Sequence, residues 1–131
     1  ITCATPGDLA VTYSTQVGRK IYNKDGSITV SFSIATSAFT HTTASGTVSI
    51  TGIPLSATFI DDRWQGSLVF QGITKANYTQ FIPTVVSNSA AMTISCSGSG
   101  QTFGSLQITD LPTGGSVILR GTVTYPIGEV F

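Results

Sequence analysis

The chain has 131 residues, which is enough for one domain with its own core. Only 9% of the residues are charged, compared with about 25% in a typical soluble domain, and six basic residues balance six acidic ones. A formal net charge of zero excludes a basic field that would attract nucleic acid or anionic lipid. Because no stretch of 18 apolar residues occurs, we also expect no membrane insertion.

Serine and threonine supply most of the polar surface and account for 37 of the 131 residues. Both side chains solvate a surface without adding charge, and both disfavour the interior of a helix. A neutral surface with few charges is weakly protected against association. We therefore expect the chain to form an oligomer.

In the first half of the chain, apolar and polar residues alternate with a period of two. Residues 1–8 are expected to be a connector, and the start at Ile1 suggests a piece of a longer polypeptide. Alternation in 9–14, in 27–34 and around Val48 and Ile50 predicts strands with one buried face. The Asp-Gly pair at 25–26 is the strongest hairpin signal in the chain.

The second half continues the same pattern. Strands are predicted at 66–73, 79–86, 92–96, 106–108 and 117–125. Pro83 places the second of these at a sheet edge or a bulge, and Gly121 indicates a bulge or a close approach of backbone in the last. Eight or nine short antiparallel strands predict an all-β fold, an antiparallel β-sandwich or jelly-roll-like single domain over residues 9–125, with 126–131 as a C-terminal tail.

The two cysteines, Cys3 and Cys96, do not form a disulfide framework, although a bond between them remains an open alternative. Cys96 shares a strand face with Met92 and Ile94, so we interpret it as a small buried hydrophobe. A catalytic cysteine would need a histidine partner, and His41 is the only histidine. This pattern does not favour cysteine catalysis.

Motifs of catalysis and metal binding are missing from the sequence. It has no GxSxG, no P-loop and no HExxH. Asp61 and Asp62 are adjacent, so on an extended chain they point to opposite faces, and two carboxylates fall short of a Ca²⁺ site. We expect no catalytic residues, no metal and no cofactor, and therefore no enzyme.

The best candidate for a binding site is the stretch DDRWQG at 61–66. It places Trp64, the single tryptophan, beside Asp61, Asp62, Arg63 and Gln65. Sugars stack on aromatic rings and are held through their hydroxyls by carboxylate, amide and guanidinium groups. The stretch therefore predicts a glycan site. The alternative is that Trp64 packs at the base of a loop whose charged side chains only solvate it.

A weaker second cluster is formed by Tyr78 and Lys75. Tyr78 offers a further aromatic ring for a sugar, with a lysine three residues before it. The alternative, that both side chains serve the local structure, is favoured here. We keep Tyr78 as a candidate ligand-binding residue.

Four stretches occur in a recognisable order: VTYSTQVGRKIYNKDGSITVSFSI, HTTASGTVSITGIPL, QGITKANYTQF and LPTGGSVILRGTVTY. This array resembles the C-terminal module of tailed-phage tail fibres and tailspikes over nearly the whole chain, about residues 6–125. The resemblance implies a homotrimeric β-sandwich or jelly-roll-like module at the distal end of a phage adhesin. It places the block 42–55 in the scaffold, with Gly46, Gly52 and Pro54 at turns and Val48 and Ile50 in the core.

The resemblance implies a virion protein that follows upstream fibre or tailspike domains and contacts polysaccharide on the bacterial surface. The chain departs from the family pattern at GRKIYNKDGS and in its last residues, PIGEVF. Three alternatives stay open: a purely structural trimerisation cap without a ligand, a cellular carbohydrate-binding module, and a small glycan hydrolase or esterase.

Overall fold

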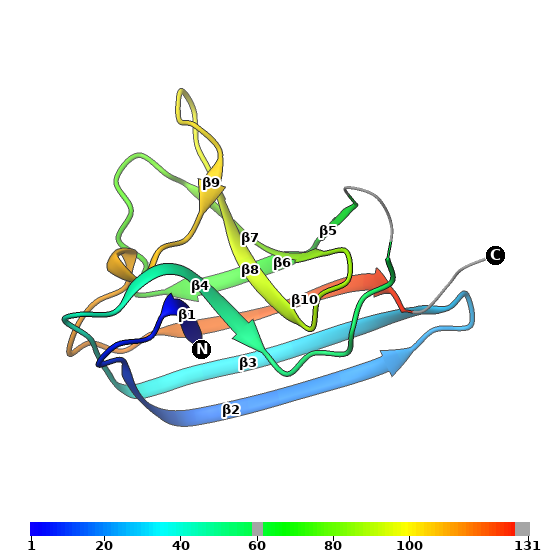
Figure 1. The fold of residues 1–131 in the computed structure, drawn as a ribbon, viewed down its shortest axis with the longest axis horizontal. Coiled ribbons are helices and arrows are strands. Elements are labelled where there is room, and N and C mark those ends of the chain that lie inside the picture. Colours follow the sequence, from blue (N-terminus) through cyan, green and yellow to red (C-terminus); the bar gives the residue numbers. More distant parts are fainter. Residues whose placement is uncertain (59–61, 128–131) are drawn as a thin grey trace.

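A computed structural model describes residues 1–58 and 62–127 of the chain. It shows antiparallel sheets packed as a β-sandwich, which confirms the predicted all-β fold (Figure 1). The strands are β1 (Thr2–Thr5), β2 (Ala10–Tyr22), β3 (Ser27–Thr40), β4 (Ser45–Thr51), β5 (Arg63–Gln65), β6 (Ser67–Gln71), β7 (Gln80–Val86), β8 (Ala91–Ser97), β9 (Gly104–Ser105) and β10 (Ile118–Pro126). A short 3-10 helix, η1 (Ile108–Asp110), precedes the last strand.

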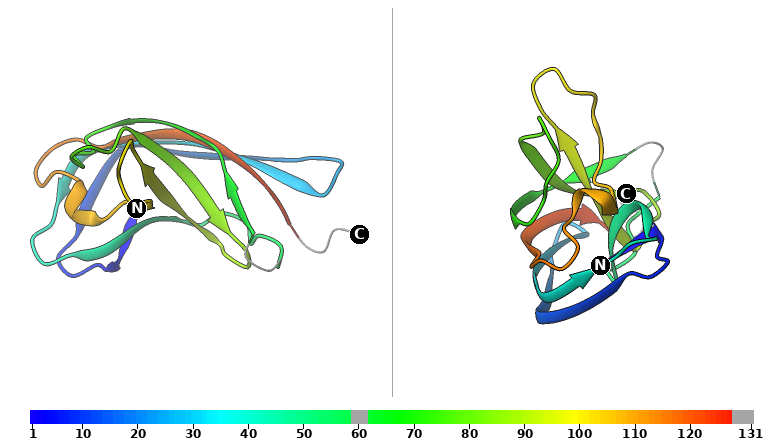
Figure 2. Two further views of the ribbon diagram at one scale, coloured as in Figure 1. Left: turned by 90° about the horizontal axis from the view of Figure 1, so that it is seen from above. Right: turned by 90° about the vertical axis from the view of Figure 1, so that its left-hand side faces the viewer.

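The strands form two sheets. One has the order β2-β3-β10-β6 and is called the β3 sheet here. The other has the order β1-β4-β8-β7-β5, with β9 beside β8, and is called the β8 sheet. The long strands of the β3 sheet form a curved layer with the β8 sheet on its inner side (Figure 2).

The core lies between the sheets and follows the predicted alternation. The inward side chains of β3, β8 and β10 are all buried: Ile28, Val30, Phe32, Ile34, Met92, Ile94, Cys96, Leu119, Val123 and Tyr125. Val48 and Ile50 of β4 are buried as well, as the resemblance implied. Alternation alone therefore located the buried face of these strands correctly.

Gly121 shows why a glycine stands inside β10. Its register partners are Phe32 on β3 and Leu68 on β6. A Cβ atom there would overlap the Ser67 carbonyl oxygen and lie 3.0 Å from the Phe32 ring. The predicted close approach of backbone is thus confirmed.

The first eight residues, predicted to be a connector, include a strand. Residues 2–5 form β1, which pairs with residues 45–49 of β4, and Cys3 lies opposite Val48. Both of these side chains are buried, so this segment adds to the core. At the other end, Pro126 still belongs to β10 and the Ile127 N–H donates to Gly26 O at 3.2 Å; residues 128–131 of the predicted tail lie outside the described residues.

The predicted strand at 106–108 is wrong. Leu106 is buried and donates its N–H to Ile94 O, but Ile108 begins η1. The Asp110 carboxylate accepts the Gln107 N–H at 2.9 Å, which closes a turn instead of extending a strand. A buried apolar pair two residues apart therefore did not distinguish a strand from a single helical turn.

Both cysteines are free and buried. Burial raises the pKa of the Cys96 thiol to about 11, and the nearby Lys75 offsets only part of this effect. A thiol that stays protonated is a poor nucleophile. Cys96 therefore acts as a core residue, as predicted.

The Asp25-Gly26 pair forms the turn of the β2–β3 hairpin, as predicted. Gly26 has a φ of +83°, a conformation that glycine adopts without steric cost. The Asp25 carboxylate accepts the Ser27 N–H at 3.0 Å and the Ser27 hydroxyl at 2.6 Å. These bonds hold the pKa of Asp25 below its ordinary value of 3.8.

A bulge in β2 decides which of its side chains face the core. The pairing of β2 with β3 shifts between Tyr13 and Thr15. Before the shift, Tyr13 lies opposite the buried Thr36; after it, Gly18 lies opposite the buried Phe32. A shift of one residue exchanges the two faces of a strand. The second half of β2 thus turns Val17 outward.

Asp8 fixes the loop between β3 and β4 to the start of β2. Its carboxylate accepts backbone N–H groups from Thr42, Thr43 and Ala44, and the hydroxyls of the two threonines also donate to it. The Thr42 hydroxyl and the backbone N–H groups hold the pKa of Asp8 well below its ordinary value of 3.8. The charged form therefore stabilises the folded state.

Replacing Asp8 with alanine is expected to lower the melting temperature by several degrees at neutral pH. Since the pKa is depressed in the folded state, the stabilisation is present above the ordinary value of 3.8 and is lost as pH falls below it. Thermal unfolding of the wild type and Asp8→Ala between pH 7 and pH 3 measures this, with Asp62→Ala, at an exposed aspartate, as the control. A difference that does not shrink at low pH would contradict the assignment.

Candidate functional site

The described residues of the DDRWQG stretch, 62–66, do not gather their side chains on one surface. Residues 63–65 form β5, and Trp64 lies opposite Val85 of β7. Val85 is fully buried, and Trp64 is half-buried against the same core. Because neighbouring residues of a strand point to opposite faces, Arg63 and Gln65 project away from the tryptophan, and both are exposed.

The two aspartates before β5 add little to a site there. Asp62 is exposed, and its backbone carbonyl accepts the Ser87 N–H at 3.2 Å. Asp61 lies outside the described residues. The described part of the stretch thus combines an inward tryptophan with outward polar groups, which agrees with the structural alternative rather than with a sugar platform.

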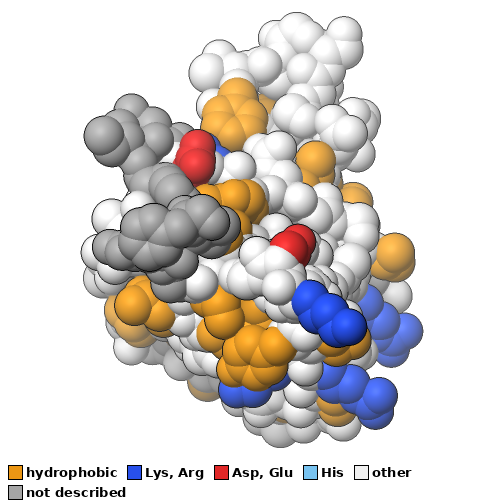
Figure 3. Space-filling view, turned by 90° about the vertical axis from the view of Figure 1, so that its right-hand side faces the viewer, with side chains coloured by type: hydrophobic (Ala, Val, Ile, Leu, Met, Phe, Trp, Pro, Cys, Tyr) orange, Lys and Arg blue, Asp and Glu red, His pale blue; other side chains and the backbone are white. Residues whose placement is uncertain are grey.

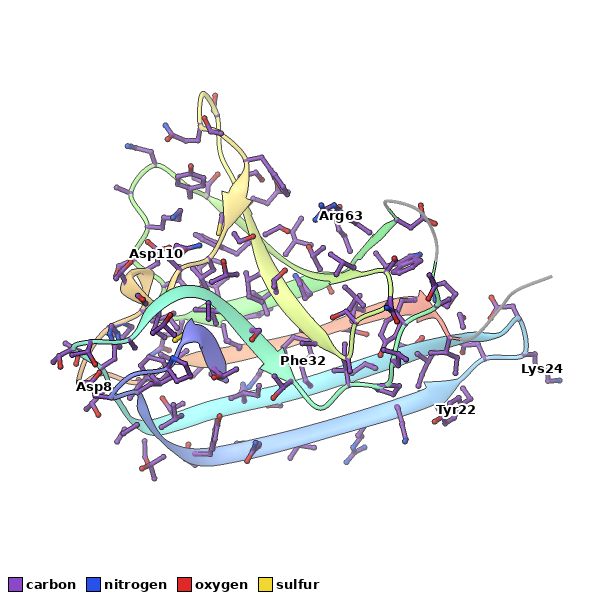
Figure 4. The ribbon with its side chains drawn as sticks, viewed as in Figure 1. Asp8, Tyr22, Lys24, Phe32, Arg63 and Asp110 are labelled. Carbon is purple, nitrogen blue, oxygen red and sulfur yellow. The ribbon has the colours of Figure 1, made fainter. Side chains whose placement is uncertain are left out.

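Tyr78 and Lys75 form a separate cluster around Asp110. The Lys75 ammonium lies 2.9 Å from the Asp110 carboxylate and 5.0 Å from the centre of the Tyr78 ring. The hydrogen bond to Asp110 raises the pKa of Lys75. The Tyr78 hydroxyl donates to Thr102 O at 2.7 Å. Figure 4 shows Asp110 and Arg63 well apart, so Tyr78 does not join Trp64 in one site.

Among the described residues, no group of three or more His, Cys, Asp or Glu side chains could hold a metal ion. Within the same residues, no helix is long and apolar enough to cross a membrane.

A groove of about 560 Å³ opens at one side of the sandwich. One wall is the second half of β2, and the other is formed by the end of β4 and the turn after it, residues 50–54. The inward side chains of β3 and of β8 form the floor, among them Phe32 and Met92. This volume is within the range of about 300–1,000 Å³ that is usual for small-ligand sites.

The groove has two structural causes. β1 pairs with residues 45–49 alone, so it does not cover β4 beyond Ser49. Gly18 lies opposite Phe32 and has no side chain to fill the space above it; no atom lies within 4 Å of where its Cβ would be. A short edge strand on one side and a glycine on the other leave the sandwich open.

The rim of the groove is polar and cationic. Gln16, Gly18, Lys20 and Tyr22 face the same way as the buried residues of β3 that they pair with. Lys20 lines the groove and is nevertheless exposed, and Tyr22, just beyond the lining residues, is 60% exposed. The Lys20 ammonium lies 5.6 Å from the centre of the Tyr22 ring.

Charge is unevenly distributed along the molecule. Asp8 and Asp110 lie at one end of the molecule and Lys24 and Tyr22 at the other (Figure 4). Viewed from the hairpin end, Lys and Arg side chains gather beside hydrophobic ones (Figure 3). The hairpin strands and turn carry Arg19, Lys20 and Lys24 but one carboxylate, so this region is positive although the chain is neutral.

The groove was not predicted from the sequence. A signal was present, because the clean alternation of Val11 and Tyr13 is followed by a stretch in which Gln16, Gly18 and Lys20 share one face. The position of the bulge decides whether this face points to the core or to solvent, and the sequence pattern alone does not give that position. Residues 50–54, interpreted as scaffold, also line the groove.

Comparisons with protein-family models, with curated proteins and with solved structures find no match for this chain.

Proposed function

We propose that the chain is the C-terminal module of a bacteriophage tail fibre or tailspike, which assembles as a homotrimer and attaches the virion to glycan on the bacterial surface. The β-sandwich fold and the four stretches of resemblance support this proposal. The observation that carries the assembly role is the outer face of the β3 sheet.

This outer face combines exposed apolar side chains with two cations, Arg19 and Arg120. Val17 is 46% exposed, Ile21 62% and Val69 71%. Val17, Ser33, Arg120 and Val69 are successive register partners across the four strands, so they form one row on this face. Exposed apolar residues on a continuous face are typical of a surface that another protein covers.

Between the apolar residues, the face is lined by hydroxyl groups. The outward residues of β3 and β10 include Thr29, Ser31, Thr122 and Thr124, and the Thr29 and Thr124 hydroxyls lie 2.9 Å apart. Neutral groups that already bond to each other lose little hydration energy on burial, whereas unpaired charges lose much. This composition suits contact between copies of the chain.

The test of assembly is sedimentation velocity on the wild type and on Ile21→Glu. We expect a trimer for the wild type and a loss of that trimer in the variant, because a carboxylate would be buried without a partner. Phe103→Glu is the matched control. Phe103 is 59% exposed and lies just before β9, which belongs to the β8 sheet and not to the outer face. A wild type that sediments as a monomer would overturn the assembly role.

The test of attachment is binding of the wild-type module to an array of bacterial glycans. Trp64→Ala examines the site expected from the sequence; binding that is lost in a variant of unchanged oligomeric state would place the ligand at β5. Binding that survives would place it elsewhere. An intact trimer that binds no glycan would favour the alternative of a structural cap.

Enzymatic activity is a separate outcome. The module is expected to leave host polysaccharide unchanged, as judged by new reducing ends and by released acetate. Appearance of either product would show a hydrolase or esterase instead of a binding module.

A further inference from the structure

We propose that the groove between β2 and residues 50–54 binds an acidic oligosaccharide, with Lys20 holding the anionic group and Tyr22 stacking on a sugar ring. This inference rests on the proposed attachment function and deepens it by naming the class of glycan and the site. The glycan site expected from DDRWQG lies at β5 instead, and that expectation named no class of glycan.

The groove combines an apolar floor with a polar rim. Its floor contains Val30, Phe32, Ile34 and Met92, and its wall includes Thr51 and Pro54. The four floor residues belong to the apolar core, yet the space above Phe32 is open because Gly18 has no side chain. A small number of polar groups around an apolar floor is the usual composition of a small-ligand site.

Lys20 brings an exposed positive charge to the rim of the groove. Within the described residues, the one ion pair closer than 4 Å is Lys75–Asp110, so Lys20 has no carboxylate partner there. The carboxylate nearest in sequence, Asp25, is bound by the N–H and hydroxyl of Ser27. An exposed ammonium without a partner is available to an anionic ligand.

A second copy of the chain is the alternative to an anionic ligand at the edge of β2. β2 is the outermost strand of the β3 sheet, and such an edge could in principle pair with the same edge of a second copy. Antiparallel pairing would bring Arg19 and Lys20 of two chains close together, and like charges on paired strands are destabilising. Lysine on an edge strand is a common protection against such pairing. The charge favours an anion instead.

The groups around Lys20 favour a sugar over other anions. Tyr22 exposes an aromatic ring beside Lys20, and Gln16 brings an amide to the same face. The outer edge of β2 also presents backbone N–H and C=O groups. Rings that stack on sugar C–H groups, amides that hold hydroxyls and an ammonium for a carboxylate fit an acidic glycan.

The experiment titrates the wild-type protein with oligogalacturonate, and with a neutral maltooligosaccharide of the same length. Isothermal calorimetry gives the affinity, and amide chemical shifts give the location. We expect oligogalacturonate to bind, with shifts at residues 16–22 and 50–54, and to bind more weakly as salt is raised.

Two variants test the site itself. Lys20→Gln should raise the dissociation constant about tenfold, the usual size for a hydrogen bond to a charged group. Gly18→Leu should abolish binding by filling the space above Phe32, without unfolding the domain, because the position is open and has an ordinary φ. Arg63→Gln removes an exposed cation from β5, outside the groove and the outer face, and should leave the affinity unchanged.

Each other outcome has a definite meaning. Binding of the neutral glycan in preference to the acidic one overturns this inference and leaves attachment standing. No binding of either probe overturns it, and attachment is then decided by the array. Equal losses in Lys20→Gln and Arg63→Gln would show non-specific attraction. A changed oligomeric state in Gly18→Leu would show that a second copy occupies the groove.

Discussion

Gly66→Ala is expected to destabilise the domain by about 3 kcal/mol or more, which lowers the urea midpoint by about 1 M or more. Gly66 connects β5 of one sheet to β6 of the other, where the chain passes against β10. A Cβ atom there would overlap the Thr122 carbonyl oxygen and lie 2.8 Å from its carbon and 2.9 Å from Val123 Cα. All three atoms are backbone, so a change of rotamer cannot relieve the clash.

Gly18→Ala is the matched control for this change. It makes the same substitution in β2, but no atom lies within 4 Å of the new methyl group. An alanine also loses less conformational entropy on folding than a glycine, so stability should stay constant or rise slightly. Equal urea midpoints for the two variants would show that β10 moves away from residue 66 at little cost.

Leu119→Ala is expected to cost about 2–5 kcal/mol of unfolding free energy. Leu119 is fully buried in β10, opposite Ile34 of β3 and Phe70 of β6. Truncation leaves a cavity in the core beneath the centre of the β3 sheet. The surrounding strands are fixed by their register, so they cannot close it completely. A domain of this kind has about 5–15 kcal/mol of stability in total, so the loss is a large fraction.

Leu55→Ala provides the same chemical change at a position that is 57% exposed. Its effect should stay below about 0.5 kcal/mol. Urea unfolding must be measured at one protein concentration, because assembly would add to apparent stability. A Leu119 variant as stable as the Leu55 variant would mean that the core around β10 is repacked without a cavity.

The bulge in β2 affects both the groove and the outer face. The bulge between Tyr13 and Thr15 turns Val17 and Ile21 to the outer face and Lys20 to the groove, with Tyr22 beyond it on the same face. Without the bulge the alternation of Val11 and Tyr13 would continue and bury Val17. A one-residue shift thus gives the same strand an apolar outer face and a cationic inner one.

The candidate site predicted from DDRWQG shows the limit of composition. Aromatic and polar residues that are adjacent in the sequence resemble a sugar-binding site by composition. On β5 they alternate between the core and the solvent, since Trp64 pairs with the buried Val85 while Arg63 and Gln65 are exposed. Adjacent residues on a strand rarely share one ligand.

The sequence by itself determined the local features: the all-β class, the hairpin at Asp25-Gly26, the buried faces of β3, β8 and β10, and the crowding at Gly121. Each depends on side-chain alternation or on a turn conformation within a few residues. The tertiary structure alone decided the pairing of β1 with β4, the bulge in β2 and the open groove over Phe32. These depend on which strands meet and where they stop, and residues distant in the chain set both.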